Sequence, residues 1–329
     1  MLLLHVVSAY PDAADNFAAA RARAALQESA VPGVMHTPDP AAAHAILFFE
    51  HHPSHDPFFL AVLRHPLVRR FPGKCLFYQD NDYATPFLPG FYCSLPRRDC
   101  RPSVAESWVY LNQHMPNRAI GHTPLSGAEP YLFSFIGAMR THPVRRQIMR
   151  LPAERALFED TSAVNGWEIP PATLAAYHTR FARTMTDSLF VLCPRGIGPN
   201  SYRIYEAMQA GRVPVIISDD FAPPAPLPWA DFALFVPEVE VASIPARLAA
   251  AAGRAPAMGA AARAAWERWC AWPAGLGRLC AELPRLLRPR AGTTLPLRRA
   301  ARLICTSRSH AKLFAYSIRH RIRRANHRT

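Results

Sequence analysis

A loop with two glycines and a helix start follows a short apolar run in the second half of the chain. The run Ser188–Cys193 is followed by Gly196 and Gly198, which allow the backbone to approach a ligand closely. Asn200 or Ser201 can cap the helix that begins there. Because a helix start presents free N–H groups and the positive end of its dipole, this spacing suits a bound phosphate.

Charged side chains flank the same helix start. Arg195 and Arg203 could each donate paired hydrogen bonds to a phosphate. Glu206 lies one turn further along, where it could accept hydrogen bonds from hydroxyl groups. The alternative is an ordinary strand–turn–helix connection in which Arg203 and Glu206 form an ion pair at a spacing of three.

This stretch resembles the donor-binding signature of the exostosin family of glycosyltransferases. That signature reads S-x-F-x-L-x-P-x-G, then S-x-R-x-x-[ED]-A-x-x-x-G-x-x-P-V-I. The matching residues of this chain are Ser188, Phe190, Leu192, Pro194, Gly196, Ser201, Arg203, Glu206, Ala207, Gly211, Pro214, Val215 and Ile216.

The likeness continues upstream of the signature. The run Leu132–Gly137, followed by Arg140 and Arg145, looks like the F-x-G…R segment that opens the family's donor domain. Leu88–Tyr92 is similar to the N-terminal halves of bacterial members, so we interpret the chain as the bacterial type. The resemblance is strong over residues 133–237, thin before them and absent from the C-terminal tail.

The resemblance implies a GT-B fold, with two Rossmann-like, doubly wound α/β domains facing a cleft. It implies an inverting transfer of a hexosyl or glycuronosyl group in polysaccharide biosynthesis. The sugar would pass from a nucleoside-diphosphate donor, bound by the C-terminal domain, to a glycan or lipid-linked acceptor.

The resemblance also gives roles to single residues. Glu206 would hold the ribose hydroxyls, Ser201 and Arg203 would line the diphosphate, and Gly137 with Arg140 would face it from the opposite side. Many retaining GT-B enzymes have a second glutamate eight positions before the one at Glu206. Gly198 stands there instead, which favours inversion.

An inverting transfer needs a general base for the acceptor hydroxyl. Asp80 and Asp82 follow one predicted strand and Glu50 ends another, at the sheet edge where ligands bind in open α/β folds. Asp80-Asn81-Asp82 also spells the D-x-D pattern of metal-dependent GT-A transferases. Because arginines and a helix start can stabilise the departing diphosphate, we expect neither a metal nor another cofactor.

Alternating apolar runs and Ala-rich stretches predict where these residues are held. We expect an N-terminal acceptor domain over residues 1–125, a nucleotide-sugar domain over 126–287 and a basic tail over 288–329. The expected strands cover residues 2–9, 45–50, 74–79, 131–136, 188–193, 213–218 and 232–236. The expected helices include residues 13–27, 58–70, 173–187, 201–210, 241–252 and 260–287.

Basic charge is concentrated at the C-terminal end. The chain carries 38 Lys and Arg against 24 Asp and Glu, and no acidic residue follows Glu282, whereas thirteen basic residues do. A helix over Ala311–Arg324 would align Phe314, Ile318 and Ile322 in an apolar stripe that suits an anionic membrane surface. The alternative is a disordered basic tail produced by an arginine-rich coding bias.

Other features limit the remaining functions. The seven cysteines include no C-x-x-C pair, and no apolar run approaches membrane-spanning length. The N-terminus lacks a signal-peptide pattern, so we expect a cytoplasmic protein, peripheral on the inner face of the plasma membrane if the tail binds lipid. We expect no nucleic-acid partner. The alternatives are a GT-B-like nucleotide-sugar epimerase and a non-catalytic protein that binds sugars or anionic surfaces.

Overall fold

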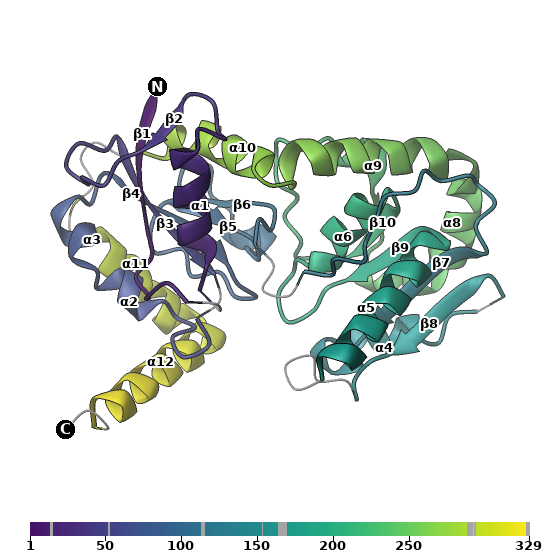
Figure 1. The fold of residues 1–329 in the computed structure, drawn as a ribbon. Helices are drawn as coiled ribbons and strands as arrows, with labels where there is room; N and C mark the ends of the chain where they lie inside the picture. The colour runs from purple at the N-terminus through teal and green to yellow at the C-terminus, as the bar shows by residue number, and fades with distance from the viewer. Residues whose placement is uncertain are drawn as a thin grey trace. The chain divides into compact units, whose positions relative to one another are not determined.

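The computed structural model describes residues 1–13, 16–51, 53–112, 116–152, 154–163, 170–287, 292 and 294–326. The chain divides into two compact units (Figure 1). The first unit comprises residues 1–112 and 272–329, and the second comprises residues 113–271.

The first unit is built on a six-stranded parallel sheet with the order β2-β1-β3-β4-β5-β6. The central strands are buried along their whole length, as expected for a parallel sheet covered on both faces. The strands are β1 (Leu2–Val7), β2 (Val34–His36), β3 (Ala45–His51), β4 (Cys75–Asp80), β5 (Gly90–Tyr92) and β6 (Ala105–Ser107).

The helices of the first unit come from both ends of the chain. They are α1 (Ala18–Gln27), α2 (Leu60–Leu63), α3 (Pro66–Arg70), α10 (Ala274–Glu282), α11 (Leu295–Thr306) and α12 (Arg308–Asn326), with short 3-10 turns at Arg97–Asp99 and Leu283–Leu286. The single helix predicted over residues 58–70 is therefore two. Phe59 has a left-handed φ of 56°, so the first helix starts only at Leu60, and Pro66 begins the second.

The second unit has a five-stranded parallel sheet with the order β11-β10-β9-β7-β8. Its strands are β7 (Tyr131–Gly137), β8 (Ala156–Asp160), β9 (Ser188–Pro194), β10 (Val213–Ile217) and β11 (Leu234–Phe235). Its helices are α4 (Pro143–Ile148), α5 (Pro171–Thr186), α6 (Tyr202–Ala210), α7 (Trp229–Phe232), α8 (Ile244–Ala251) and α9 (Ala255–Trp269), with 3-10 turns at Met139–Thr141, Glu238–Ser243 and Ala252–Arg254.

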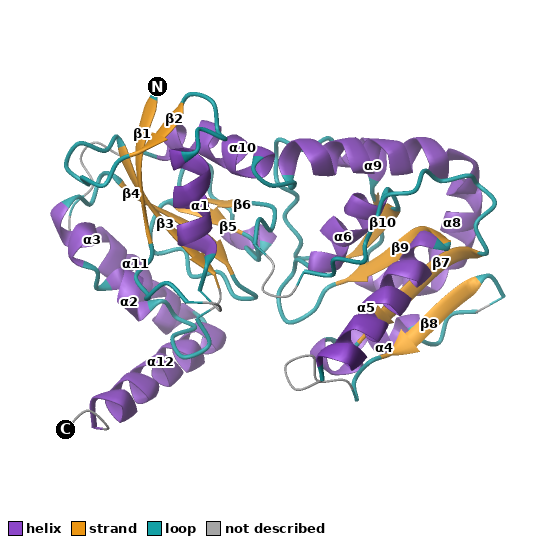
Figure 2. Cartoon of the chain, viewed as in Figure 1, coloured by secondary structure: helices purple, strands orange, loops and turns teal. Residues whose placement is uncertain are grey.

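Among the described residues, a helix follows each of β7, β8, β9 and β10 before the next strand (Figure 2), whereas β2 leads to β3 and β4 to β5 without one. Every strand pairing among these residues is parallel. This confirms the predicted α/β class, with two Rossmann-like units of the kind found in the GT-B fold. Among the described residues, no helix is both long enough and apolar enough to cross a bilayer.

The compact units divide at residues 112/113 and 271/272, whereas we predicted boundaries at 125/126 and 287/288. Two side chains of the second unit hold the segment before residue 125. Gln209 donates to the carbonyl of Ile120 at 3.2 Å, and Arg212 donates to that of Thr123 at 2.6 Å. At the other boundary, the chain has already returned to the first unit at Trp272, whose ring lies 4.0 Å from the Arg21 guanidinium carbon.

The C-terminal segment is part of the first unit. Phe314 and Ile318 pack against its core, and the rings of Phe314 and Phe58 lie 5.4 Å apart, edge to face. The helix predicted over Ala311–Arg324 lies within α12, but the expected membrane-facing role is wrong for Phe314 and Ile318, because they cover the core of the first unit. Ile322, the third residue of the stripe, is 56% exposed. The alternative of a disordered tail is also wrong over α11 and α12. Residues 288–291, 293 and 327–329 of the predicted tail lie outside the described residues.

Candidate functional site

Each sheet reverses its strand order at one point, and ligands of open α/β sheets bind beside the carboxyl ends of the strands at that point. In the second unit the reversal lies between β7 and β9, which pair side by side. Their carboxyl ends are Gly137 and Pro194. The predicted donor residues Arg195 and Gly196 follow β9 directly, so the fold places them at the expected ligand position.

Arg145, on α4, bridges these two strand ends. Its side chain is buried, and its guanidinium donates to the carbonyl oxygens of Ala138 at 3.1 Å, Arg195 at 2.9 Å and Pro194 at 3.4 Å. We did not predict Arg145 as a site residue, although the upstream segment contained it. The one sequence signal was its place in that segment.

Arg140, which we did predict, lies differently. Its side chain is exposed and donates to the carbonyl oxygen of Ser162 at 2.6 Å. It therefore holds the loop after β8 in this structure rather than the loop after β9.

Arg203 reaches the same strand ends from α6. Ser201 caps this helix as predicted, because its hydroxyl accepts a hydrogen bond from the Arg203 N–H at 3.4 Å. The Arg203 guanidinium donates to the carbonyl oxygen of Ile136 and lies 4.9 Å from the Phe135 ring centre. Its Nε is buried without a hydrogen-bond partner among the described residues. Arg203 thus has donor capacity that the described protein groups do not use.

The two glycines beside these arginines are explained by close approach. A Cβ on Gly137 would lie 3.0 Å from Nη2 of Arg203 and 3.3 Å from Nη1 of Arg145. A Cβ on Gly196 would lie 3.2 Å from Nη2 of Arg145. Any larger residue would press on a guanidinium. Gly198 is buried in the same loop.

Arg195 is partly neutralised in this structure. Its guanidinium lies 3.5 Å from a carboxylate oxygen of Asp220 and 3.6 Å from one of Glu238. His142, at the start of α4, lies 3.8 Å from the other Glu238 oxygen. Burial lowers the pKa of His142, and Arg195 lowers it further. The loop after β9 therefore carries a charge network in addition to the buried Arg145 and the half-buried Arg203.

Glu206 follows one turn after the cap of α6. Burial raises the pKa of its carboxyl group, while the nearby positive charge of Arg203 acts in the opposite direction. The carboxylate forms no ion pair with Arg203 among the described contacts, so the alternative interpretation of these two residues as a simple ion pair is not supported. A desolvated carboxylate next to a helix start can accept hydrogen bonds from ligand hydroxyls.

The first unit reverses its strand order between β1 and β3. Glu50 lies at this position, and its carboxylate accepts hydrogen bonds from the Ser8 hydroxyl at 2.7 Å and from the Ala9 N–H at 2.6 Å. Its side chain has no exposed surface, and burial raises its pKa to about 7. Ser8, which links Glu50 to the surface, is half-buried.

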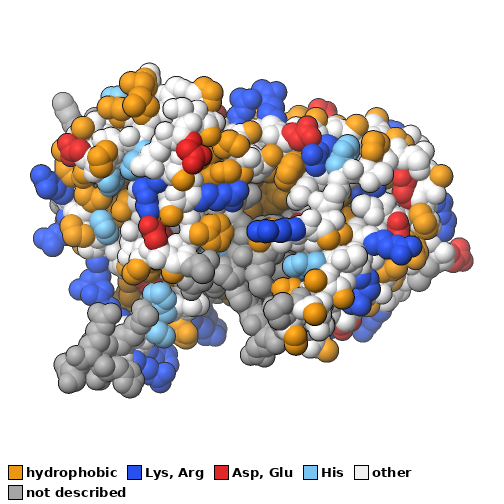
Figure 3. Space-filling view, in the orientation of Figure 1, with side chains coloured by type: hydrophobic (Ala, Val, Ile, Leu, Met, Phe, Trp, Pro, Cys, Tyr) orange, Lys and Arg blue, Asp and Glu red, His pale blue; other side chains and the backbone are white. Residues whose placement is uncertain are grey.

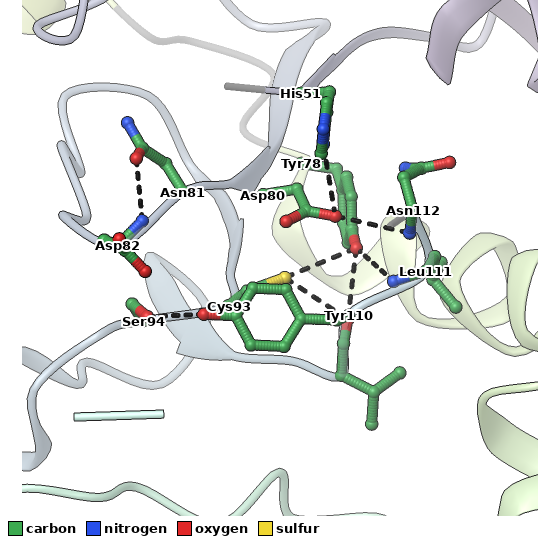
Figure 4. Close-up of polar contacts among 11 residues, drawn as sticks. His51, Tyr78, Asp80, Asn81, Asp82, Cys93, Ser94, Tyr110, Leu111 and Asn112 are labelled. Carbon is green, nitrogen blue, oxygen red and sulfur yellow. Dashed lines mark hydrogen bonds and ion pairs between the residues drawn. The ribbon is translucent and has the colours of Figure 1, made fainter. Parts of the chain in front are cut away.

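The other two base candidates do not share a site (Figure 4). Asp80, at the end of β4, is fully buried; its carboxylate accepts from the Asn112 N–H at 3.3 Å and lies 3.7 Å from Nδ1 of His51. Asp82 is exposed, on the loop after the strand. The two carboxylates of the D-x-D pattern therefore lie in different environments, one buried and one exposed. Within the described ranges, no group of three or more His, Cys, Asp or Glu side chains could hold a metal ion.

Comparison with known proteins finds a similarity mainly over the second unit. Residues 109–251, which are less than half of the chain, match the model of the exostosin GT47 domain. The match includes every residue that we predicted for the donor site, together with Arg145. It includes none of the three predicted bases.

Curated relatives match shorter stretches. A probable glucuronosyltransferase of Oryza sativa subsp. japonica, Os03g0107900, is 48% identical over 142 residues, which are 41% of this chain and 32% of that protein. The probable beta-1,4-xylosyltransferase IRX10L of Arabidopsis thaliana is 42% identical over 65 residues, 19% of this chain and 16% of its own. Ribitol-5-phosphate xylosyltransferase 1 of Danio rerio is 26% identical over 108 residues, which are 33% of this chain and 25% of that protein. This chain thus spans a third or less of these relatives' length. The interpretation as a bacterial type stays a prediction.

Proposed function

We propose that the chain is an inverting glycosyltransferase that moves a sugar from a nucleoside-diphosphate donor to a glycan or lipid-linked acceptor in polysaccharide biosynthesis. The observation that carries the proposal is the arrangement of Arg145 and Arg203 around Gly137, at the strand reversal of the exostosin GT47 domain. Two guanidinium groups beside a capped helix start suit a diphosphate.

The donor residues divide into two roles in this proposal. Arg203 and the helix start at Ser201 bind the diphosphate directly, because Arg203 has unused donors. Arg145 is a positioning residue, since its hydrogen bonds go to backbone carbonyls of the two strand ends. Glu206 accepts hydrogen bonds from the ribose hydroxyls. Positive charge from both arginines stabilises the departing diphosphate, so we expect no metal requirement.

The transferred sugar is a glycuronic acid or a pentose in our proposal. This proposal is supported by the names of two relatives, a probable glucuronosyltransferase and a probable xylosyltransferase. A hexosyl donor, which we also expected from the sequence, is the alternative within the same site.

The acceptor is deprotonated in the first unit, and Glu50 is the best supported of the three predicted bases. A carboxyl pKa of about 7 leaves this residue part ionised at neutral pH, which suits a general base. Because Glu50 is buried, the acceptor proton passes to Ser8 Oγ while the Ser8 proton passes to Glu50. The acceptor oxygen then bonds to the anomeric carbon as the bond to the diphosphate breaks.

A panel of nucleoside-diphosphate sugars tests the proposal by thermal unfolding of the full chain. A donor present at 100 times its dissociation constant adds ~2.7 kcal/mol to the free energy of unfolding. We expect one or more nucleotide sugars to raise the melting temperature, and transfer to appear only with an acceptor present. Stabilisation by nucleic acid alone would overturn the proposal, and sugar isomerisation without an acceptor would indicate the epimerase instead.

A further inference from the structure

The outward face of α12 combines basic and apolar side chains in one stripe. Arg308, Lys312, Tyr316, Arg319 and Arg323 follow each other at spacings of four, four, three and four, so they share one side of the helix. All five are exposed. Ile322 lies beside Arg319 on the same side and is 56% exposed, and Tyr316 is 51% exposed.

The opposite side of α12 is fixed to the first unit, which decides the direction in which this stripe faces. The Phe58 N–H donates to the buried Ser317 hydroxyl at 3.1 Å, and the His310 ring lies 2.7 Å from the carbonyl oxygen of Ala84. Phe314 and Ile318 pack on the core beside them. The basic stripe is therefore held toward solvent by a folded unit, unlike a free tail that could turn either face outward.

The neighbouring helix α11 has the same character. Leu297 is 54% exposed, and Arg298 and Arg302 are also exposed, whereas Pro296 and Ala300 are buried. No acidic residue occurs after Glu282, so no carboxylate of this segment offsets the positive charge. Lys, Arg and His side chains lie over α12 on the face drawn in Figure 3.

We infer that the outward faces of α11 and α12, defined here as the hairpin surface, dock the protein on an anionic lipid bilayer. Basic side chains are attracted to the anionic headgroups, and large apolar side chains between them enter the interfacial layer. The exposed Leu297 and Ile322 favour a bilayer over nucleic acid, because phosphate binding alone gives no reason for exposed aliphatic groups. The inference does not depend on the proposed sugar transfer.

Sedimentation with vesicles tests this surface with the full chain. The wild type is expected to bind vesicles of phosphatidylcholine with 30% phosphatidylglycerol far better than pure phosphatidylcholine vesicles. The triple variant Lys312→Glu, Arg319→Glu, Arg323→Glu should bind at least about 100-fold more weakly, since each basic residue near the headgroups is worth a factor of about five. Equal sedimentation of the wild type with both vesicles would overturn the inference.

Two further variants separate this surface from net charge and from general polyanion binding. The matched control Arg118→Glu, Arg150→Glu, Arg254→Glu changes three exposed arginines of the second unit and should keep most of the vesicle binding; an equal loss would contradict a specific surface. The double variant Tyr316→Ser, Ile322→Ser should weaken vesicle binding several-fold and leave binding to duplex RNA unchanged. The double variant could instead keep its binding to both vesicles and duplex RNA while the triple variant loses both. In that case the surface binds polyanions in general, and the membrane assignment is wrong. Circular dichroism and melting temperature establish that each variant is folded.

Discussion

The guanidinium Nε of Arg145 donates to the backbone carbonyl oxygen of Arg195 at 2.9 Å and thereby ties α4 to the loop that follows β9. The same side chain also binds the backbone at Ala138, after β7. One buried charge thus fixes both strand ends at the reversal of the second sheet. The position of the loop with Gly196, and hence of any ligand on it, depends on this contact.

Replacement of Arg145 should therefore affect both folding and donor binding. Arg145→Ala should lower the free energy of unfolding by ~1.5–3 kcal/mol, the range for hydrogen bonds to a charged group. Arg145→Lys keeps the charge but lacks the planar guanidinium fork that reaches both strand ends, so we expect donor affinity to fall about tenfold, or ~1.4 kcal/mol. Denaturant unfolding and donor titration measure the two effects. Arg146→Ala, exposed on the same helix, is the control; equal losses in both variants would argue against the bridging role.

Glu206 should contribute to donor binding at little cost in stability. Burial raises the pKa of its carboxyl group, and the positive charge of Arg203 opposes this shift only in part. Glu206→Ala should weaken donor binding by ~1.5–3 kcal/mol. Unfolding stability should stay the same or rise, since a desolvated carboxylate is removed. Unchanged donor affinity in the folded variant would reject the ribose assignment.

Glu50 predicts a pH dependence of stability with a definite sign. Its pKa is about 7 in the folded chain and 4.5 as the reference value, so between these pH values the folded chain keeps a proton that the unfolded chain releases. The free energy of unfolding should thus fall as pH rises from 4.5 to 7, by about 3 kcal/mol from this group. Glu50→Gln should lack this component. Parallel pH profiles of wild type and variant would contradict the raised pKa.

The same residue predicts a pH dependence of activity. A base must be deprotonated, so kcat/KM of the wild type should rise with pH and level off above about 7. Asp82→Asn, on the exposed loop, should keep this profile. If Asp82→Asn abolishes turnover and Glu50→Gln does not, Asp82 is the base.

Ser317 should stabilise the first unit from near the C-terminal end of the chain. Ser317→Ala leaves the buried Phe58 N–H without its partner, which should cost ~1–3 kcal/mol. Ser309→Ala, exposed on the same helix, is the matched control. Truncation before α11 should destabilise the first unit further, because Ala300, Phe314 and Ile318 are removed from its core. If chemical denaturation gives the same free energy of unfolding with and without the C-terminal segment, this packing is refuted.

The local pattern predicted the elements around the candidate site of the second sheet well, because their signals lie close together in the sequence. The Ser201 cap and the strands β7 and β9 follow from residue types at short spacing. The short strands β2, β5 and β6 were not predicted, since three residues carry too little periodicity. Strand β8 was also missed, because its half-exposed residues show no apolar run.

Residues whose role depends on distant partners were harder to predict. The guanidinium of Arg145 donates to the carbonyl oxygen of Arg195, fifty positions away in the sequence. No local sequence pattern predicts such a long-range contact. Phe314 and Ile318 have the helical spacing expected for any amphipathic helix, and the spacing alone does not distinguish a bilayer from the protein's own core. The buried Asp80 and the exposed Asp82 likewise differ because a strand ends between them.

Calorimetric titration of a nucleoside-diphosphate sugar into Gly137→Ala and Gly253→Ala, in a buffer with chelator, tests the central claim most directly. A Cβ at position 137 presses on both Arg203 and Arg145, whereas one at 253 meets nothing within 4 Å. We predict that the wild type and Gly253→Ala bind the donor without metal, and that folded Gly137→Ala binds it at least about tenfold more weakly, ~1.4 kcal/mol. Equal affinity of the two variants, or binding that requires added metal, would contradict a donor site at the strand ends of β7 and β9.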